Sequence, residues 1–124
     1  MANEKIDQKD FESVIEYKGK KIPVVFNLNV MQNIQNEFGT FDSWAQLTAG
    51  EDGKEINMRA LIFGLCEMMN EGIDIENEEK GTNEPMISLK QAGRIITAFG
   101  IANSTNVMQK TVVDASKDDS SKNG

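Results

Sequence analysis

Hydrophobic and polar positions alternate in two short segments near the N-terminus, whereas apolar residues recur at helical spacing along the rest of the chain. Val14–Tyr17 and Ile22–Phe26 are rich in β-branched and aromatic residues. The intervening Lys18-Gly19-Lys20-Lys21 contains a glycine, which readily adopts positive φ in a tight turn. Pro23 has no amide hydrogen and therefore belongs at the start or the edge of a strand. The pattern predicts an N-terminal β-hairpin.

A first helix is expected directly after this hairpin. Asn27 is a suitable N-cap, because its side chain can accept a hydrogen bond from a free amide of the first turn. Helical spacing is kept by Leu28, Met31, Phe38 and either Ile34 or Gln35, which are expected to face inward. Gly39 is a typical helix end.

A second, short helix follows in the sequence. Thr40 can cap it, and Phe41, Trp44 and Leu47 lie within it. Two interpretations of the aromatic pair are open. Phe41 and Trp44 either form an exposed anchor for a partner or close the edge of the core.

The strongest helical pattern runs from Asn57 to Glu71. Five apolar residues recur at i, i+3, i+4, i+7 and i+11, namely Met58, Leu61, Ile62, Leu65 and Met69. Gly72 is expected to end this helix. We predict that it forms the buried centre of the domain.

The next helix begins with a recognisable capping signal. Ile87-Ser88-Leu89-Lys90-Gln91 combines an apolar residue before the cap with a Ser-x-x-Gln capping box. The residues expected to face inward are Leu89, Ala92, Ile96 and Phe99. Gly100 is expected to end the helix.

The chain is divided into three parts on this basis. Residues 1–10 are a flexible lead-in, residues 11–115 form one domain, and residues 116–124 are a flexible polar tail. The last helix of the domain is expected to begin at Ile101 or only at Ser104 and to end at Ala115. The expected fold is α+β and mainly helical. It consists of an N-terminal β-hairpin followed by four to five helices.

Composition narrows the functional classes. A chain of 124 residues has room for one domain and is too short for a barrel enzyme, which needs roughly 250 residues. It contains no histidine, the commonest general base and metal ligand. The single cysteine, Cys66, excludes an internal disulfide. We therefore expect a chain that is not an enzyme and has no cofactor or metal.

Charge and hydropathy also limit the expected partners. The net charge of −7 disfavours binding to the phosphate backbone of nucleic acid. Met1–Asp10 lacks the apolar core of a signal peptide, and the longest apolar stretch, Ala60–Leu65, is too short to span a bilayer. We expect a cytoplasmic protein that binds neither nucleic acid nor membrane.

Acidic residues are concentrated in one stretch. Seven of them lie from Glu67 to Glu84 beside one base, Lys80, so this stretch carries −6 of the net −7. It does not fit an EF-hand, because the sixth residue from Asp74 is Glu79 rather than glycine. We expect a loop here, either simply solvated or forming an electrostatic contact with a basic partner. The candidate contact residues are Asp74, Glu76, Glu78 and Glu79.

Other chemically notable residues are assigned structural roles. Cys66 lies inside the predicted central helix with no histidine to activate it, so it is interpreted as a small hydrophobe. The seven methionines are interpreted as core residues in preference to an adaptable binding surface. Lys18, Lys20 and Lys21 are interpreted as a solvated turn.

Several segments, in their order along the chain, resemble a known family. They are Tyr17–Asn29, Glu37–Trp44, Ala60–Leu65, Met69–Ile75 and Leu89–Ile96. Together they resemble the small tail assembly chaperones of long, flexible-tailed (siphovirus-type) phages and prophages of Gram-positive bacteria. The likeness covers roughly Phe11 to Val113 and rests on the order of the segments and on the size of the chain.

The resemblance implies a role in virion morphogenesis. Such a chaperone binds the tape-measure protein while the tail is built, keeps its long hydrophobic helices soluble and helps to recruit tail-tube subunits. It acts in the host bacterial cytoplasm and is not expected in the mature virion; self-association is possible. The alternatives are a structural head–tail connector or tail-terminator component, which would form a stable ring and remain in the particle, and a small regulatory adaptor.

The resemblance also implies a second, longer product made by a programmed −1 frameshift near the stop codon. Lys122-Asn123 can be encoded as AAA AAC or AAA AAU, which forms a slippery heptamer if the Ser121 codon ends in A. The polar tail would then be a linker that tolerates either an end or a fused domain. The alternative is an ordinary frayed C-terminus.

Overall fold

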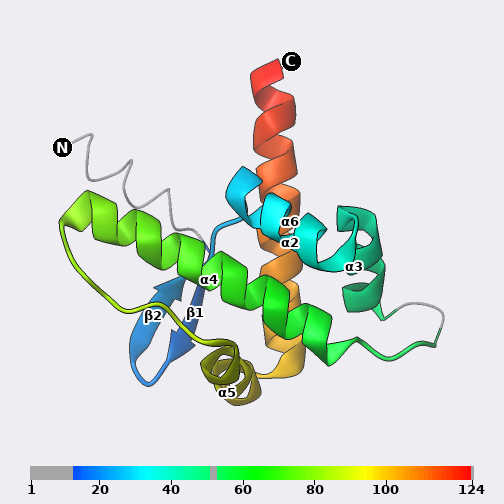
Figure 1. Ribbon diagram of the computed structural model, residues 1–124, viewed down its shortest axis with the longest axis horizontal. Helices are drawn as coiled ribbons and strands as arrows, with labels where there is room; N and C mark the ends of the chain where they lie inside the picture. The colour runs from blue at the N-terminus through cyan, green and yellow to red at the C-terminus, as the bar shows by residue number, and fades with distance from the viewer. Residues whose placement is uncertain (1–12, 51–52, 124) are drawn as a thin grey trace.

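The computed structural model describes residues 13–50 and 53–123, with side chains through residue 117 (Figure 1). The elements are β1 (Val14–Tyr17), β2 (Lys20–Pro23), α2 (Leu28–Phe38), α3 (Phe41–Ala49), α4 (Met58–Lys80), α5 (Leu89–Phe99) and α6 (Ile101–Asn123). Over these described ranges, one antiparallel hairpin and five helices confirm the expected α+β, mainly helical fold. The expected lead-in, residues 1–10, lies outside the described residues.

The β-hairpin turns through two residues. Lys18 and Gly19 both have positive φ, 52° and 76°, which matches the twist of the two strands. The second strand therefore begins at Lys20, earlier than expected. Ile15 pairs with Ile22, and both side chains are buried in the core.

Helix α4 is the centre of the fold and runs across the molecule in Figure 1, crossed by α6. The expected helix end at Gly72 is wrong, because α4 continues to Lys80 and is capped by Gly81 in the left-handed conformation. Gly72 is instead a point of close approach. A β-carbon there would lie 2.5 Å from the carbonyl oxygen of Pro23 at the end of β2.

A hydrogen bond fixes the hairpin at the same place. The amide of Val25 donates to the carbonyl oxygen of Met68 in α4, with a nitrogen–oxygen distance of 3.1 Å. Met68 lies one helical turn before Gly72, so the chain leaving β2 is held against α4 by backbone contacts on successive turns. The missing side chain of Gly72 is what allows this approach.

The core contains most of the residues expected from helical spacing. Leu61, Leu65 and Met69 of α4 are fully buried, and Met108 of α6 is nearly so. The expectation is wrong at the first residue of three helices, where the side chain is exposed: Leu28, Met58 and Leu89. Periodicity identifies the inward face of a helix, but its first residue extends past the neighbouring elements. The buried residues of α5 include the expected Ala92 and Ile96, together with Ile95, and those of α2 are Val30 and Ile34.

The three predicted helix caps are confirmed by their hydrogen bonds, and Asn57, expected as the first residue of the central helix, is its N-cap. The side chains of Asn27, Thr40 and Asn57 each accept a bond from an amide of the following turn. Ser88 and Gln91 form the complete capping box, because each side chain accepts from the other residue's amide. Local sequence therefore determines these boundaries.

The last helix is longer than expected. The sequence predicts an end at Ala115, but α6 continues to Asn123, and Figure 1 shows its C-terminal end projecting beyond the rest of the fold. The segment after Ala115 has no apolar periodicity, which is why it was expected to be a tail. It also has no glycine or proline before residue 124, so nothing in it interrupts the backbone hydrogen bonding of a helix.

Two helical glycines provide a test of the close approach. Gly72→Ala is expected to destabilise the fold by about 1–3 kcal/mol, because its methyl group would overlap the backbone of Pro23. Gly93→Ala is the matched control: its β-carbon would meet only the side chain of Ile62, at 3.7 Å. The control should be stabilised by about 0.5–1 kcal/mol, as expected for alanine in a helix. Urea denaturation measures both, and a neutral Gly72→Ala would contradict the assignment.

Two leucine substitutions test the core. Leu61→Asp places an unpaired charge at a fully buried position and should cost several kcal/mol, comparable with the stability of a small domain. Leu28→Asp, at a side chain that is 81% exposed, should change stability by no more than about 0.5 kcal/mol. Thermal unfolding distinguishes the two. Equal melting temperatures for Leu61→Asp and the unmodified chain would show that the core is assigned wrongly.

Candidate functional site

An open cleft of about 370 Å³ lies between the hairpin, the second half of α4 and α5. We call it the hairpin cleft. Its apolar lining residues include Ile22, Ile73, Pro85, Met86, Ile87 and Ile95. Its charged lining residues are Lys18, Lys20, Lys21, Glu76, Glu84 and Arg94. The volume falls within the range of roughly 300–1,000 Å³ that is typical of ligand pockets.

The cleft begins where the contact between the hairpin and α4 ends. At Gly72 and Pro23 the two elements touch, whereas Ile73 and Glu76, further along α4, line the open space opposite β2. Four consecutive residues of β2, Lys20–Pro23, contribute to the opposite wall. The close approach therefore closes one end of the cleft and positions both of its walls.

The connection between α4 and α5, residues 82–88, forms an extended strap along α4. Asn70 accepts a hydrogen bond from the amide of Ile87 at 2.7 Å and donates to its carbonyl oxygen at 2.9 Å. Asn77 makes the same pair of bonds with Glu84, both at 3.0 Å. Two asparagine side chains thus satisfy both backbone polar groups of two strap residues, as a neighbouring β-strand would.

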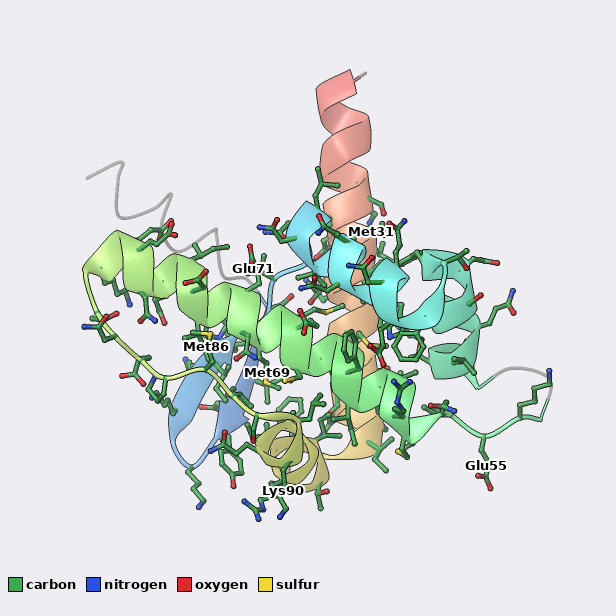
Figure 2. The ribbon with its side chains drawn as sticks, in the orientation of Figure 1. Met31, Glu55, Met69, Glu71, Met86 and Lys90 are labelled. Atoms are coloured by element: carbon green, nitrogen blue, oxygen red, sulfur yellow. The ribbon has the colours of Figure 1, made fainter. Side chains whose placement is uncertain are left out.

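Pro85 and Met86 lie between the two fastened positions of the strap. The Met86 side chain is 47% exposed and lines the hairpin cleft (Figure 2). Proline has no amide that would need a partner. The strap can therefore hold an apolar side chain at the mouth of the cleft while the backbones of Glu84 and Ile87, on either side, are fastened to α4.

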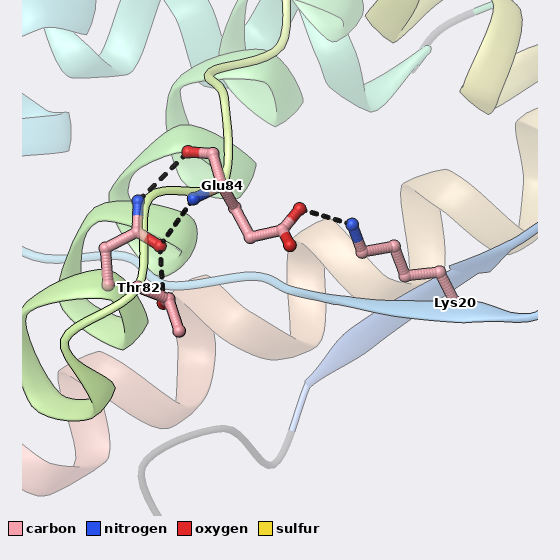
Figure 3. Close-up of polar contacts among 4 residues, drawn as sticks. Lys20, Thr82 and Glu84 are labelled. Carbon is pink, nitrogen blue, oxygen red and sulfur yellow. Dashed lines mark hydrogen bonds and ion pairs between the residues drawn. The ribbon is translucent and has the colours of Figure 1, made fainter.

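An ion pair connects the strap to the hairpin. Glu84 accepts a hydrogen bond from the ammonium group of Lys20, as Figure 3 shows, and both side chains remain largely exposed. Glu76, on the α4 wall, pairs with Lys80 one turn later, with a nitrogen–oxygen distance of 3.0 Å. Both carboxylates of the cleft therefore already have a cation.

The acidic candidates lie on helix α4, not in a loop. The expectation of a loop is wrong for the reason given above: the helix does not end at Gly72. Glu76 is half-buried and lines the cleft, whereas Asp74, Glu78 and Glu79 are exposed, and none of these three lines the cleft. The four carboxylates are thus not brought together into one site.

The acidic residues earlier in α4 bind α2. Glu71 accepts hydrogen bonds from the side-chain amides of Asn27, at 2.7 Å, and Asn29, at 3.2 Å. Glu67 accepts from Asn33 at 2.6 Å. Because Asn27 also caps α2, the carboxylate of Glu71 lies near the N-terminus of that helix, where negative charge is favourable. These two acids contribute to packing between helices.

The aromatic candidates close the core. Trp44 is buried, and its indole N–H donates to the carbonyl oxygen of Ala60 at 2.9 Å. Phe41 is half-buried beside Phe26 and Trp44, with ring centroids 5.7 and 5.4 Å away. The aromatic pair therefore closes the edge of the core, and Trp44 is not an exposed anchor for a partner.

Cys66 is buried beneath the strap. Its thiol donates to the carbonyl oxygen of Ile87 at 3.3 Å. Burial, and secondarily the negative charge of Glu67, raise the pKa of the thiol to about 11. The thiol is therefore protonated at neutral pH, which fits the small hydrophobe expected from the sequence.

Sequence reasoning missed the two asparagines that fasten the strap and two residues that line the hairpin cleft. Asn70 and Asn77 are seven residues apart and thus share a helix face, a signal that becomes meaningful only once α4 is known to extend beyond Gly72. The sequence does carry a signal for Met86, because it is an apolar residue within a polar segment. Arg94 carried no local signal.

A scan against models of protein families and searches of curated proteins and of solved structures found no match. Among the described residues, no group of three or more cysteine, aspartate or glutamate side chains is placed to hold a metal ion. No helix in the same part of the chain is long and apolar enough to cross a membrane.

The thiol of Cys66 gives a direct test of its burial. With the pKa raised from 9.0 to about 11, the native protein at pH 8 should contain about a hundredfold less thiolate than the unfolded chain. Its reaction with an aromatic disulfide reagent should be slowed at least as much, and denaturant should restore it. Equal rates in native and unfolded protein would contradict the buried placement.

The same shift predicts how stability depends on pH. The pKa of the Cys66 thiol is higher in the folded protein than in the unfolded chain. The protonated thiol therefore makes its full contribution to the stability of the fold below about pH 9, and this contribution is lost as the pH rises toward about 11. Cys66→Ala removes the titrating group and serves as the control. The free energy of unfolding should fall more steeply over this interval in the unmodified protein than in Cys66→Ala.

Proposed function

We propose that this protein is a non-enzymatic assembly chaperone that binds an apolar segment of a larger partner in the hairpin cleft. The partner class that the sequence resemblance favours is the tape-measure protein of a phage tail. The protein would hold the segment in the host bacterial cytoplasm, help to recruit tail-tube subunits and leave before the virion is complete. The observation that carries the proposal is the open, largely apolar cleft with Met86 at its mouth.

The lining of the cleft suits a peptide segment. Apolar side chains from the hairpin, α4, the strap and α5 offer a surface for the apolar face of a helix or for alternate residues of an extended chain. Methionine is flexible and adapts to differently shaped partners, which is useful for a chaperone that binds several related segments. Charged residues around this surface keep the free protein from associating through it.

Binding can be tested with overlapping peptides that cover the tape-measure protein encoded in the same genome. The binding peptides should be those with a marked apolar face. Met86→Asp should weaken their binding by at least about tenfold, because it places a charge at the mouth of the apolar cleft.

Met58→Asp is the matched control. Its methionine is exposed to a similar extent, 41% against 47%, and does not line the cleft. The control should bind as the unmodified protein does. The proposal fails if no peptide binds, or if Met86→Asp and Met58→Asp bind equally well.

The location of the protein during assembly separates the chaperone from a structural component. A chaperone should be present in lysates that contain growing tails and absent from purified particles. A head–tail connector or tail-terminator subunit should be found in the particles in a fixed number of copies.

A further inference from the structure

The charges of the hairpin cleft are distributed unevenly between its walls. Lys18, Lys20 and Lys21 come from the hairpin, and Arg94 comes from α5. These four are among only 13 basic residues in a chain with a net charge of −7. We call these four residues together the hairpin wall, and they concentrate positive charge locally on an acidic protein.

The cations of this wall outnumber the carboxylates that the cleft provides for them. Glu84 pairs with Lys20, and Glu76 pairs with Lys80, which does not line the cleft. Within the side chains that the structure describes, Lys21 and Arg94 have no ion-pair partner. Lys18 lies over the ring of Tyr17, 5.3 Å from its centroid. The cleft therefore has unused capacity to bind anions.

We propose that the hairpin wall recognises carboxylates, so that the segment bound in the cleft carries acidic side chains beside its apolar ones. This inference rests on the proposed function and specifies its partner. Lys21 and Arg94 bind the carboxylates directly, and the guanidinium of Arg94 can form two parallel hydrogen bonds with one of them. The apolar residues of the segment lie against Ile73, Met86 and Ile95.

Glu84 occupies part of this wall in the free protein. Its carboxylate binds Lys20 from within the same chain, as a carboxylate of the partner would (Figure 3). The side chains of the pair are 63% and 49% exposed, so the pair is weak and readily exchanged. Glu84 thus competes with an acidic partner, and its removal should strengthen binding. A partner with basic side chains would give the opposite result.

The test uses three synthetic peptides with the same leucine face. Their flanking positions are all glutamate, all glutamine or all lysine, and binding to the full chain is measured by calorimetry at low salt. The glutamate peptide should bind at least about tenfold more tightly than the glutamine peptide. The lysine peptide should bind most weakly, although the whole protein is acidic.

Variants of the protein identify the residues that cause the preference for the glutamate peptide. Arg94→Gln and Lys21→Gln should each weaken binding of the glutamate peptide by about fivefold and leave binding of the glutamine peptide unchanged. Lys90→Gln is the matched control, because Lys90 lies on the same helix as Arg94 but does not line the cleft (Figure 2). Glu84→Gln should strengthen binding of the glutamate peptide by about twofold to threefold.

The outcomes separate this inference from the proposed function. The proposal that the hairpin wall binds carboxylates would be overturned by equal binding of the three peptides, by stronger binding of the lysine peptide, by binding of none of them, or by weaker binding in Glu84→Gln. None of these results would affect the binding of tape-measure peptides or its loss in Met86→Asp. A further outcome would also overturn the inference: if the glutamate peptide binds only after residues 1–12 are removed, the natural occupant of the hairpin wall is the chain's own N-terminal segment and not a partner.

Discussion

The arrangement of this protein depends on one backbone contact, the approach of Gly72 in α4 to Pro23 at the end of the hairpin. With any larger residue at position 72, the hairpin and the central helix would have to separate. Because they touch there, the amide of Val25 reaches the carbonyl oxygen of Met68, and α4 passes the hairpin without interruption. The part of α4 beyond this contact then forms a wall of the cleft instead of a free loop.

The cleft remains open because its border is fastened by side chains. Asn70 and Asn77 bind both backbone polar groups of Ile87 and Glu84, so the strap needs no neighbouring strand. A strap held in this way can present Met86 at a solvent-accessible edge, where burial would otherwise be favoured. This combination of a rigid border and an adaptable apolar side chain is the physical basis of the proposed chaperone role.

Local signals in the sequence predicted the local structure well. The hairpin turn and the three predicted helix caps depend on residues within one turn of each other, and all of them are found in the structure. Gly72 could not be interpreted in the same way, because a glycine that ends a helix and a glycine that admits a neighbouring backbone look alike in sequence. The cleft was missed for a related reason: Lys20 and Glu84 are 64 residues apart, and only the tertiary fold brings them together.

The most direct test of the central claim, that the hairpin cleft is the binding surface, is NMR mapping of a complex. A tape-measure peptide that binds should shift the backbone amide signals of β2 and of the strap, above all those of Lys21, Met86 and Ile87. Signals from the second half of α6, which does not line the cleft, should stay unchanged. Shifts confined to α6, or to the exposed acidic residues Asp74 and Glu78, would contradict the account.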